Sequence, residues 1–342
     1  MNSRGFALAL IGVAVLTEVC ASGVPAGNLA RVADVSEARL RADVTTLTAI
    51  GSGIAVQREG KARRLVPGNP RSQEDKIAYL RSQLEPLGYA IEIETFALPA
   101  RFQVSANFQG RNLIATKRGT TEPTRVLELG AHHDTMATAG ADDNSSGVAG
   151  VLEVARVLAR VPTAKSIRFC FFDFEELGML GSAEHVMHIK NAPEAFEGIL
   201  VFEMIGYAVD AEHTQRTPVR IPGLIDPPTT GDFISVLGNM RSGNLGAAFE
   251  RAADRLTPPL RYFSLNRLAG FIKDAARSDQ SSYWAAGLPG VMLTDTANFR
   301  NPHYHRATDT IETLNFAFMT QVVRAATLCL LERAGAAGAD RE

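Results

Sequence analysis

Four apolar runs in the chain have the length and composition of buried β-strands. Polar or glycine-containing segments separate them, and the runs are RVLELGAH (125–132), SIRFCFFDF (166–174), GILVFEMIGY (198–207) and GVMLTD (290–295). Between the first two, SGVAGVLEVARVLARV (146–161) places apolar residues at the spacing of an amphipathic helix. Alternation of strand, helix and strand indicates a parallel sheet with helices on both faces. We therefore expect an α/β fold, a three-layer αβα sandwich with a mostly parallel central sheet.

Weaker patterns predict further elements before and after these strands along the chain. Residues 72–88 predict a helix and residues 89–96 alternate like a strand. A last helix is expected at about 313–334, packed on the sheet. Residues 208–243 are rich in Pro, Gly and Thr and predict an insertion loop over the edge of the sheet. The chain has no internal repeat, so residues 27–342 are expected to form one domain.

The N-terminus has the layout of an export signal. Arg4 precedes the apolar run 6–16, and small residues follow. This run is too short to span a bilayer and matches the apolar region of a signal peptide. We expect residues 1–26 to be a signal peptide and the protein to be exported, as a periplasmic or secreted protein. A buried N-terminal helix is the alternative, and lipid attachment at Cys20 is disfavoured because the two residues before it are not small.

Composition excludes several classes of function. The 342 residues carry a formal net charge of −2, and 46% of them are hydrophobic. Scattered basic residues leave no electrostatic footprint for nucleic acid. The mature region contains no long apolar stretch that would span a membrane. Cys170 and Cys329 both lie in apolar segments, so two buried thiols are expected rather than a disulfide.

Ionisable side chains collect where the predicted strands end. Parallel strands bring their carboxyl ends to one edge of the sheet, where ligands bind, and the residues found there are His132, Asp134, Glu175, Glu176, Glu203 and His305. Each alone is explained by an exposed charge, but their shared placement predicts a metal site. Imidazole and carboxylate suit zinc, and two neighbouring cations need a shared anionic ligand. Asp143, within the small-residue segment GADDNSSG, is suited to that position.

These segments resemble a known family, the co-catalytic zinc aminopeptidases that form family 28 of the metallopeptidases. The stretches that carry the resemblance, in order between about residues 110 and 315, are GAHHDT, GADDNSSGVAGVLEVARVL, FFDFEELGMLGS, VFEMIGY, RSDQSSYWAAGLPGVMLTD and NPHYHRATDT. The resemblance implies the fold of the zinc exopeptidases and two zinc ions per chain.

The resemblance also implies a role for each site residue. Asp143 would bridge the two zinc ions, and the remaining ligands would be His132 and Glu203 on one zinc, Glu176 and His305 on the other. Glu175 would be the general base. Asp134 would hold His132 in the correct tautomer. Tyr304 would either donate a hydrogen bond to the developing oxyanion or be a packed aromatic side chain. The family often has a cis peptide bond after the bridging aspartate.

The chain departs from the family pattern at two positions. Glu203 stands where aspartate is usual, which makes occupancy of the second zinc site less certain. Gln280 replaces a histidine that is not expected to be a ligand, and we expect it to alter the polarity of the pocket. Among the other histidines, His185 and His188 lie one helical turn apart and are expected to be a surface pair. His213 lies in the insertion loop, and His303 outside the metal shell.

The expected function is that of a zinc-dependent aminopeptidase acting on peptides with a free N-terminus. A glutaminyl cyclase-like acyltransferase with one zinc is an alternative, kept open by Glu203. A non-catalytic, receptor-like binding protein is the other, although every ligand position and the base carry competent side chains. The sequence does not fix the preferred N-terminal residue or the oligomeric state.

Overall fold

The computed structural model describes residues 26–51, 54–59, 62–67, 71–102, 109–136, 138–223 and 225–336. Its strands are β1 (Ile54–Glu59), β2 (Ala62–Pro67), β3 (Ala90–Ala97), β4 (Gln109–Lys117), β5 (Glu122–His132), β6 (Lys165–Phe172), β7 (Ala195–Glu203), β8 (Ile234–Gly238), β9 (Tyr262–Leu265) and β10 (Gly290–Thr294). Its α-helices are α1 (Ala26–Arg31), α2 (Glu37–Ile50), α3 (Ser72–Leu84), α4 (Gly147–Leu158), α5 (Leu180–Asn191), α6 (Gly243–Asp254), α7 (Gln280–Ala285) and α8 (Phe316–Arg333).

A mixed eight-stranded sheet forms the middle layer, in the order β3-β4-β6-β5-β7-β10-β8-β9. The four strands predicted from the apolar runs, β6, β5, β7 and β10, are parallel to their neighbours within this group. The sheet is antiparallel at the pairs β3–β4, β4–β6 and β10–β8. The parallel centre is buried on both faces, as expected for strands that read as continuous apolar runs.

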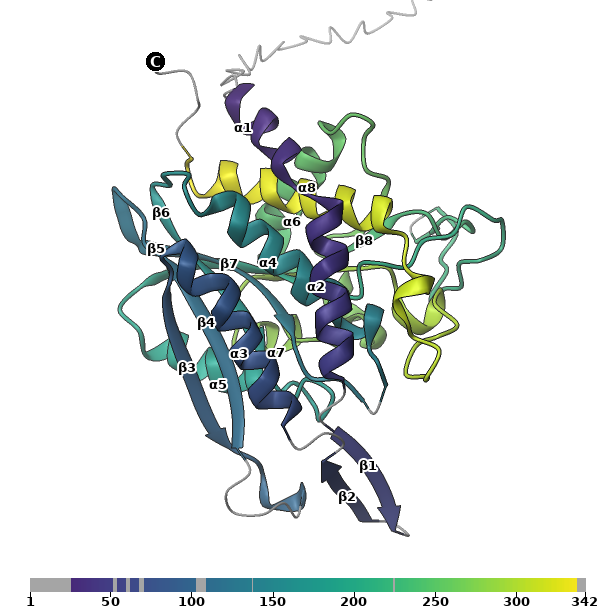
Figure 1. The fold of residues 1–342 in the computed structure, drawn as a ribbon. Helices are drawn as coiled ribbons and strands as arrows, with labels where there is room; N and C mark the ends of the chain where they lie inside the picture. The colour runs from purple at the N-terminus through teal and green to yellow at the C-terminus, as the bar shows by residue number, and fades with distance from the viewer. Residues whose placement is uncertain are drawn as a thin grey trace, which may run out of the picture.

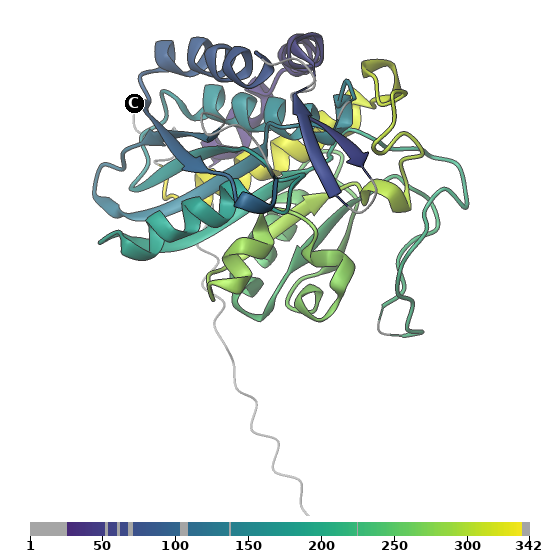
Figure 2. The same ribbon diagram turned by 90° about the horizontal axis from the view of Figure 1, so that it is seen from below.

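Helices cover both faces of the sheet, as Figures 1 and 2 show. Helices α2, α4, α6 and α8 pack together on one face, and α5 and α7 pack on the other. Alternate residues of one strand therefore enter different cores: Phe169 and Phe171 of β6 join the larger cluster with α4 and α8, while Cys170 and Phe172 of the same strand join the smaller cluster with α5. The three-layer αβα architecture is confirmed.

One expected boundary changes, and another cannot be compared with the described residues. The predicted insertion loop at 208–243 ends earlier than expected, because Ile234–Gly238 form strand β8 inside the sheet. The proposed signal peptide falls outside the described residues except for Ala26, where α1 begins. Within the described ranges, no helix has the length and apolar character needed to cross a membrane. Cys170 and Cys329 are both free and buried, as expected.

Candidate metal centre

The end of β5 presents one imidazole nitrogen to a group of carboxylates. His132 is fully buried, and its Nδ1–H donates to the backbone carbonyl oxygen of Asp134 at 3.1 Å. This bond leaves the lone pair on Nε2, which has no hydrogen-bond partner. Nε2 lies 3.5 Å from Asp143 Oδ1 and 3.4 Å from Glu203 Oε2. A buried nitrogen lone pair aimed at two carboxylates is the arrangement of a metal ligand.

A tight segment between β5 and α4 places Asp143. The backbone N–H groups of Asp142 and Asp143 both donate to the carboxylate of Asp309, at 2.9 and 3.1 Å. Small residues are required here, since a Cβ on Gly147 would lie 2.9 Å from the carbonyl oxygen of Phe202. The peptide bond after Asp143 is cis, as the family resemblance implied. The side-chain amide of Asn144 donates to the carbonyl oxygen of Phe202 at 2.9 Å and so holds this segment against the end of β7.

The loop after β6 supplies two adjacent glutamates. The backbone N–H groups of Glu175 and Glu176 donate to the carboxylate of Asp134, at 3.0 and 3.2 Å. This contact joins the β6 loop to the end of β5. Asp134 was expected to orient His132 through its side chain, but its carboxylate oxygen lies 3.5 Å from Nδ1, farther than its carbonyl oxygen. Asp134 therefore orients His132 through its carbonyl oxygen and holds the loop after β6 through its carboxylate.

A second group of ligands shares Asp143. His305 Nε2 lies 3.1 Å from Asp143 Oδ2 and 3.0 Å from Glu176 Oε2. The structure thus forms two sets of close ligand atoms, His132–Asp143–Glu203 and Asp143–Glu176–His305. The two oxygens of Asp143 face different histidines, which is the geometry of a bridging carboxylate.

The donor set fits zinc. With Zn–N and Zn–O bonds near 2.0–2.2 Å, two ligands of one tetrahedral ion lie about 3.4 Å apart, close to the separations of 3.0–3.5 Å in both sets. Glu176 Oε1 is a further buried atom without a partner. Both orphaned atoms, His132 Nε2 and Glu176 Oε1, would be satisfied by cations placed within these sets.

Electrostatics in the site also call for cations. Burial and the repulsion of neighbouring carboxylates raise the pKa of Glu175 well above its ordinary value, and burial with Asp143 raises the pKa of Glu176 to about 7. Burial opposes the charging of His305, but its bonds to Asp143 and Glu176 raise its pKa to about 10. Protons partly neutralise a site so rich in carboxylates, and bound metal ions would replace them.

Comparison with known proteins decides the family. Residues 112–329 match the model of peptidase family M28. The chain belongs to peptidase family M28.

Relatives and solved structures agree with this assignment. The protein YfbL of Escherichia coli is 33% identical over 224 residues, which are 62% of this chain and 68% of YfbL. The zinc aminopeptidase BSAP from Bacillus subtilis has the same fold, with a TM-score of 0.68 at 15% identity over 88% of this chain and 96% of BSAP. A glutaminyl cyclase from Porphyromonas gingivalis is similar, with a TM-score of 0.63 at 18% identity over 87% and 99% of the two chains.

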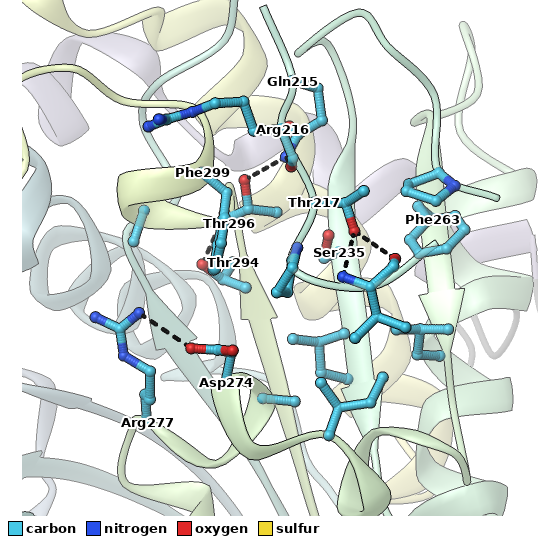
Figure 3. Close-up of a pocket in the computed structure, with 18 of the residues that line it drawn as sticks. Gln215, Arg216, Thr217, Ser235, Phe263, Asp274, Arg277, Thr294, Thr296 and Phe299 are labelled. Atoms are coloured by element: carbon cyan, nitrogen blue, oxygen red, sulfur yellow. Dashed lines mark hydrogen bonds and ion pairs between the residues drawn. The ribbon is translucent and has the colours of Figure 1, made fainter. Parts of the chain in front are cut away.

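Tyr304 lies where this M28 site meets a neighbouring cavity. Its ring stacks on that of His305, with centroids 3.9 Å apart, and its hydroxyl oxygen accepts a hydrogen bond from Arg277 at 3.2 Å. It lines an apolar cavity together with Glu203. Figure 3 shows other residues of this cavity, among them Arg277 and Thr294. Tyr304 is thus a packed aromatic side chain, and its part in catalysis stays a prediction.

Several side chains of the M28 site escaped the sequence analysis, among them Ser278 and Lys76. Ser278 donates to Glu203 Oε2 at 2.6 Å, and Lys76, buried under the centre, donates to the carbonyl oxygen of His133 at 2.6 Å. Burial lowers the pKa of Lys76 to about 8, against the attraction of Asp134. Ser278 is the first residue of the SDQ segment, which lies in a stretch that carries the family resemblance, so a usable signal was present. Nothing in the helical pattern of 72–88 distinguishes Lys76 from a surface lysine.

Two other expectations are corrected. Gln280 does not line the cavity; it is fully buried and donates to the carbonyl oxygen of Ala275 at 2.7 Å. His185 is not a surface residue, because its two ring nitrogens face Glu94 at 2.7 Å and Glu128 at 3.2 Å inside the protein. His188 is exposed, as expected. His303 lies outside both ligand sets and contacts Thr308.

Proposed function

We propose that this protein is a zinc-dependent aminopeptidase with two zinc ions in its site. The observation that carries the proposal is the pair of ligand sets that share Asp143, with Glu175 beside them. Family M28 membership supports peptide-bond hydrolysis, and the neighbour BSAP is described as a zinc aminopeptidase. Zinc bound here would polarise a peptide carbonyl and lower the pKa of water.

Glu175 is the group proposed to move the proton. Its side chain lies among the carboxylates of Glu176 and Glu203, and the residue is only 8% exposed. A carboxylate with a raised pKa is suited to take a proton from water and then to protonate the leaving amine. Asp134 holds its backbone in place. The hydroxyl oxygen of Tyr304 accepts from Arg277 and so keeps its own proton free, and Tyr304 is proposed to donate that proton in a hydrogen bond to the oxyanion.

The charge of the site favours an N-terminal substrate. The ligand sets hold three carboxylates, and two further acidic side chains, Glu175 and Asp279, lie close to Glu203. Two bound Zn²⁺ ions would offset four of these five negative charges, and the remaining negative charge attracts an α-ammonium group and repels a C-terminal carboxylate. This asymmetry supports aminopeptidase action over carboxypeptidase action.

Fold alone does not separate the peptidase from a glutaminyl cyclase, because both kinds of structure match this chain with similar TM-scores. The ligand sets favour the peptidase, since His132 and Glu203 complete a second metal position. An acyltransferase that works with one zinc ion would not need a second set of metal ligands.

The Glu175→Gln variant tests the proposed base. Glutamine keeps the shape of the side chain but cannot take a proton, so we expect zinc content to stay at the wild-type value. Hydrolysis of aminoacyl p-nitroanilides should fall by about 10²–10⁴-fold in kcat. Zinc is measured by atomic emission and kcat by release of nitroaniline.

The matched control is Glu184→Gln, on an exposed residue of α5, which should keep full activity. If Glu175→Gln retained wild-type kcat, the assigned base would be wrong. Cyclisation of N-terminal glutamine without hydrolysis of any anilide would favour the acyltransferase. Purified protein that binds no zinc would favour a non-catalytic role.

A further inference from the structure

A third set of close metal-binding atoms lies inside the protein, away from the candidate metal centre. It consists of Glu128, Cys170 and His185, whose donor atoms all lie within 4.8 Å of one another. Each of the three residues is at most 2% exposed. Glu128 lies four residues before His132 on β5, which places the set about 13 Å along the strand from the centre. The set shares no residue with the two ligand sets around Asp143.

The alternation of the strands brings the members of this set to one face of the sheet. Leu127 and Leu129 of β5 enter the larger core, so Glu128 between them points to the opposite face. Cys170 of β6 points to that face too, where it joins the smaller core with residues of α5. Helix α5 covers the face and supplies His185. Three elements far apart in the sequence thus converge on one buried point.

His185 is oriented as a metal-binding histidine would be. Its Nδ1 lies 2.7 Å from Glu94 Oε1, and the side-chain amide of Asn112 donates to the other oxygen of Glu94 at 3.0 Å. A carboxylate on one ring nitrogen fixes the imidazole and directs the other nitrogen to the metal. Here that other nitrogen, Nε2, lies 3.2 Å from Glu128 Oε1 and 3.9 Å from Cys170 Sγ.

The separations and the donor types suit zinc. Tetrahedral ligands of one Zn²⁺ lie about 3.5 Å apart for nitrogen and sulfur and about 3.4 Å apart for nitrogen and oxygen. The observed 3.9 and 3.2 Å lie within about half an ångström of these values. Thiolate, imidazole and carboxylate all bind zinc. The hydroxyl of Tyr283 donates to Glu128 Oε2 at 2.7 Å, so this ligand is held from behind, as His185 is by Glu94.

Zinc can enter this set without changing its total charge. In the metal-free protein both ring nitrogens of His185 face carboxylates, which requires a proton on each nitrogen. Zn²⁺ would displace the proton on Nε2 and the thiol proton of Cys170, so one doubly charged ion replaces two protons. The nearby cation Arg168, 3.5 Å from Glu128, is paired with Glu194 in either state.

We propose that Glu128, Cys170 and His185 form a third metal site, which binds one Zn²⁺ and joins β5, β6 and α5. Because all three residues are buried, the site is structural rather than catalytic. It ties α5 to the sheet, and α5 begins at Leu180, four residues after Glu176, so it also steadies the loop that carries the proposed base. The inference does not depend on the proposed aminopeptidase function, because no ligand of the proposed catalytic centre takes part.

Cobalt in place of zinc reports a sulfur ligand directly. A thiolate bound to Co²⁺ absorbs in the near ultraviolet by charge transfer, whereas the two ligand sets around Asp143 contain only imidazole and carboxylate. The full chain is produced with Cys20→Ser in medium supplied with Co²⁺, since a buried site is filled as the chain folds. We expect the purified protein to show the charge-transfer band.

Cys170→Ser and Cys329→Ser, each added to Cys20→Ser, form a matched pair. Among the described residues Cys329 is the other buried free cysteine, and it lies on α8 in the larger core. We expect Cys170→Ser to lose the band and about one metal ion per chain, as measured by atomic emission, and Cys329→Ser to keep both. His132→Ala, which removes a ligand of the proposed catalytic centre, should also keep the band.

The outcomes decide the inference even if one variant fails to fold. With Cys20 and Cys329 both replaced, Cys170 is the sole thiol of the chain, so a band in that protein assigns the sulfur ligand without the Cys170→Ser variant. No band in that protein, or a band that survives in Cys170→Ser, would overturn the third site. Protein that shows the band but hydrolyses no anilide would leave the third site in place while the proposed function fails.

Discussion

A single carboxylate, that of Asp134, organises much of the site. It accepts the backbone N–H groups of Glu175 and Glu176, while the carbonyl oxygen of the same residue accepts Nδ1–H of His132. The proposed base and a ligand from each set thus depend on one residue that binds no metal. Partners of this kind affect metal affinity because they orient the ligands.

Asp134→Asn should therefore weaken zinc binding. The amide has one acceptor oxygen in place of two, and its NH₂ group would face a backbone N–H. We expect zinc affinity to fall by about 10–100-fold, with a parallel loss of kcat, as measured by chelator competition and by anilide hydrolysis. The control is Asp75→Asn, on an exposed residue of α3. Unchanged affinity would show that the two N–H contacts do not position the ligands.

Residue types and strand ends were enough to predict a metal site at this edge of the sheet, whereas the ligand set followed from the family resemblance and the hydrogen-bond partners from neither. The structure brings together the donor atoms of His132, Asp143, Glu176, Glu203 and His305. The sequence could not show that the carbonyl oxygen of Asp134, rather than its carboxylate, is nearest to Nδ1. Such choices depend on backbone direction within a turn, which no side-chain pattern records.

At the scale of elements, helix α5 contributes His185 to a network of buried ionic groups. His185 lies between Glu94 of β3 and Glu128 of β5, and Tyr283 of α7 donates to the other oxygen of Glu128 at 2.7 Å. Arg168 on the neighbouring strand lies 3.5 Å from Glu128. The two histidines of α5 looked alike in the sequence, because helical spacing does not reveal which one faces the sheet. Glu128, a charged residue within an apolar strand, was the sequence signal that would have indicated a buried partner for one of these histidines.

His185→Gln tests this network. Burial opposes the imidazolium, but Glu128 outweighs it and raises the pKa of His185 well above its ordinary value. Removing one partner of a buried ion pair costs about 3–5 kcal/mol of unfolding free energy. Because the pKa is raised on folding, the stabilisation is full below about pH 6.5 and is lost as pH rises through the folded-state pKa.

Chemical unfolding at several pH values measures that difference. The gap between wild type and His185→Gln should be widest at pH 6 and should narrow toward alkaline pH. Lys190→Gln, on an exposed lysine of the same helix, should change stability by less than about 0.5 kcal/mol. A gap that widened with pH would contradict a charged His185.

The elements predicted with most success are those with long apolar runs. The four central strands, α4 and α8 lie where their patterns placed them. The predicted insertion loop at 208–243 included strand β8, because the five residues of β8 follow a segment rich in Pro, Gly and Thr. A short strand near the sheet edge owes its pairing to β10 and β9, which a local pattern does not report.

For the whole molecule, the metal centre and the fold should stabilise each other. The ligands come from the loops after β5, β6, β7 and β10, so the sites are assembled only in the folded chain. A ligand that binds only the folded state adds about 4.1 kcal/mol at a concentration of 1,000 times its Kd. Zinc removal should accordingly lower the melting temperature.

Scanning calorimetry with saturating zinc and with a chelator measures this effect. Glu175→Gln should show the same zinc-dependent gain as wild type, because it keeps every ligand. His132→Ala should show a smaller gain. An equal melting temperature with and without zinc would mean that the ligand sets do not hold the metal tightly in the native state.

The order of the ligands along the chain has a consequence for biosynthesis. Asp143 leaves the ribosome early, but His305, which completes its second ligand set, follows some 160 residues later. A nascent chain therefore cannot assemble the full centre until nearly all of it has been made, and any product that terminates before His305 lacks a ligand. Occupation of both metal positions would therefore be a late event, and a full metal content would distinguish finished chains from chains that end before His305.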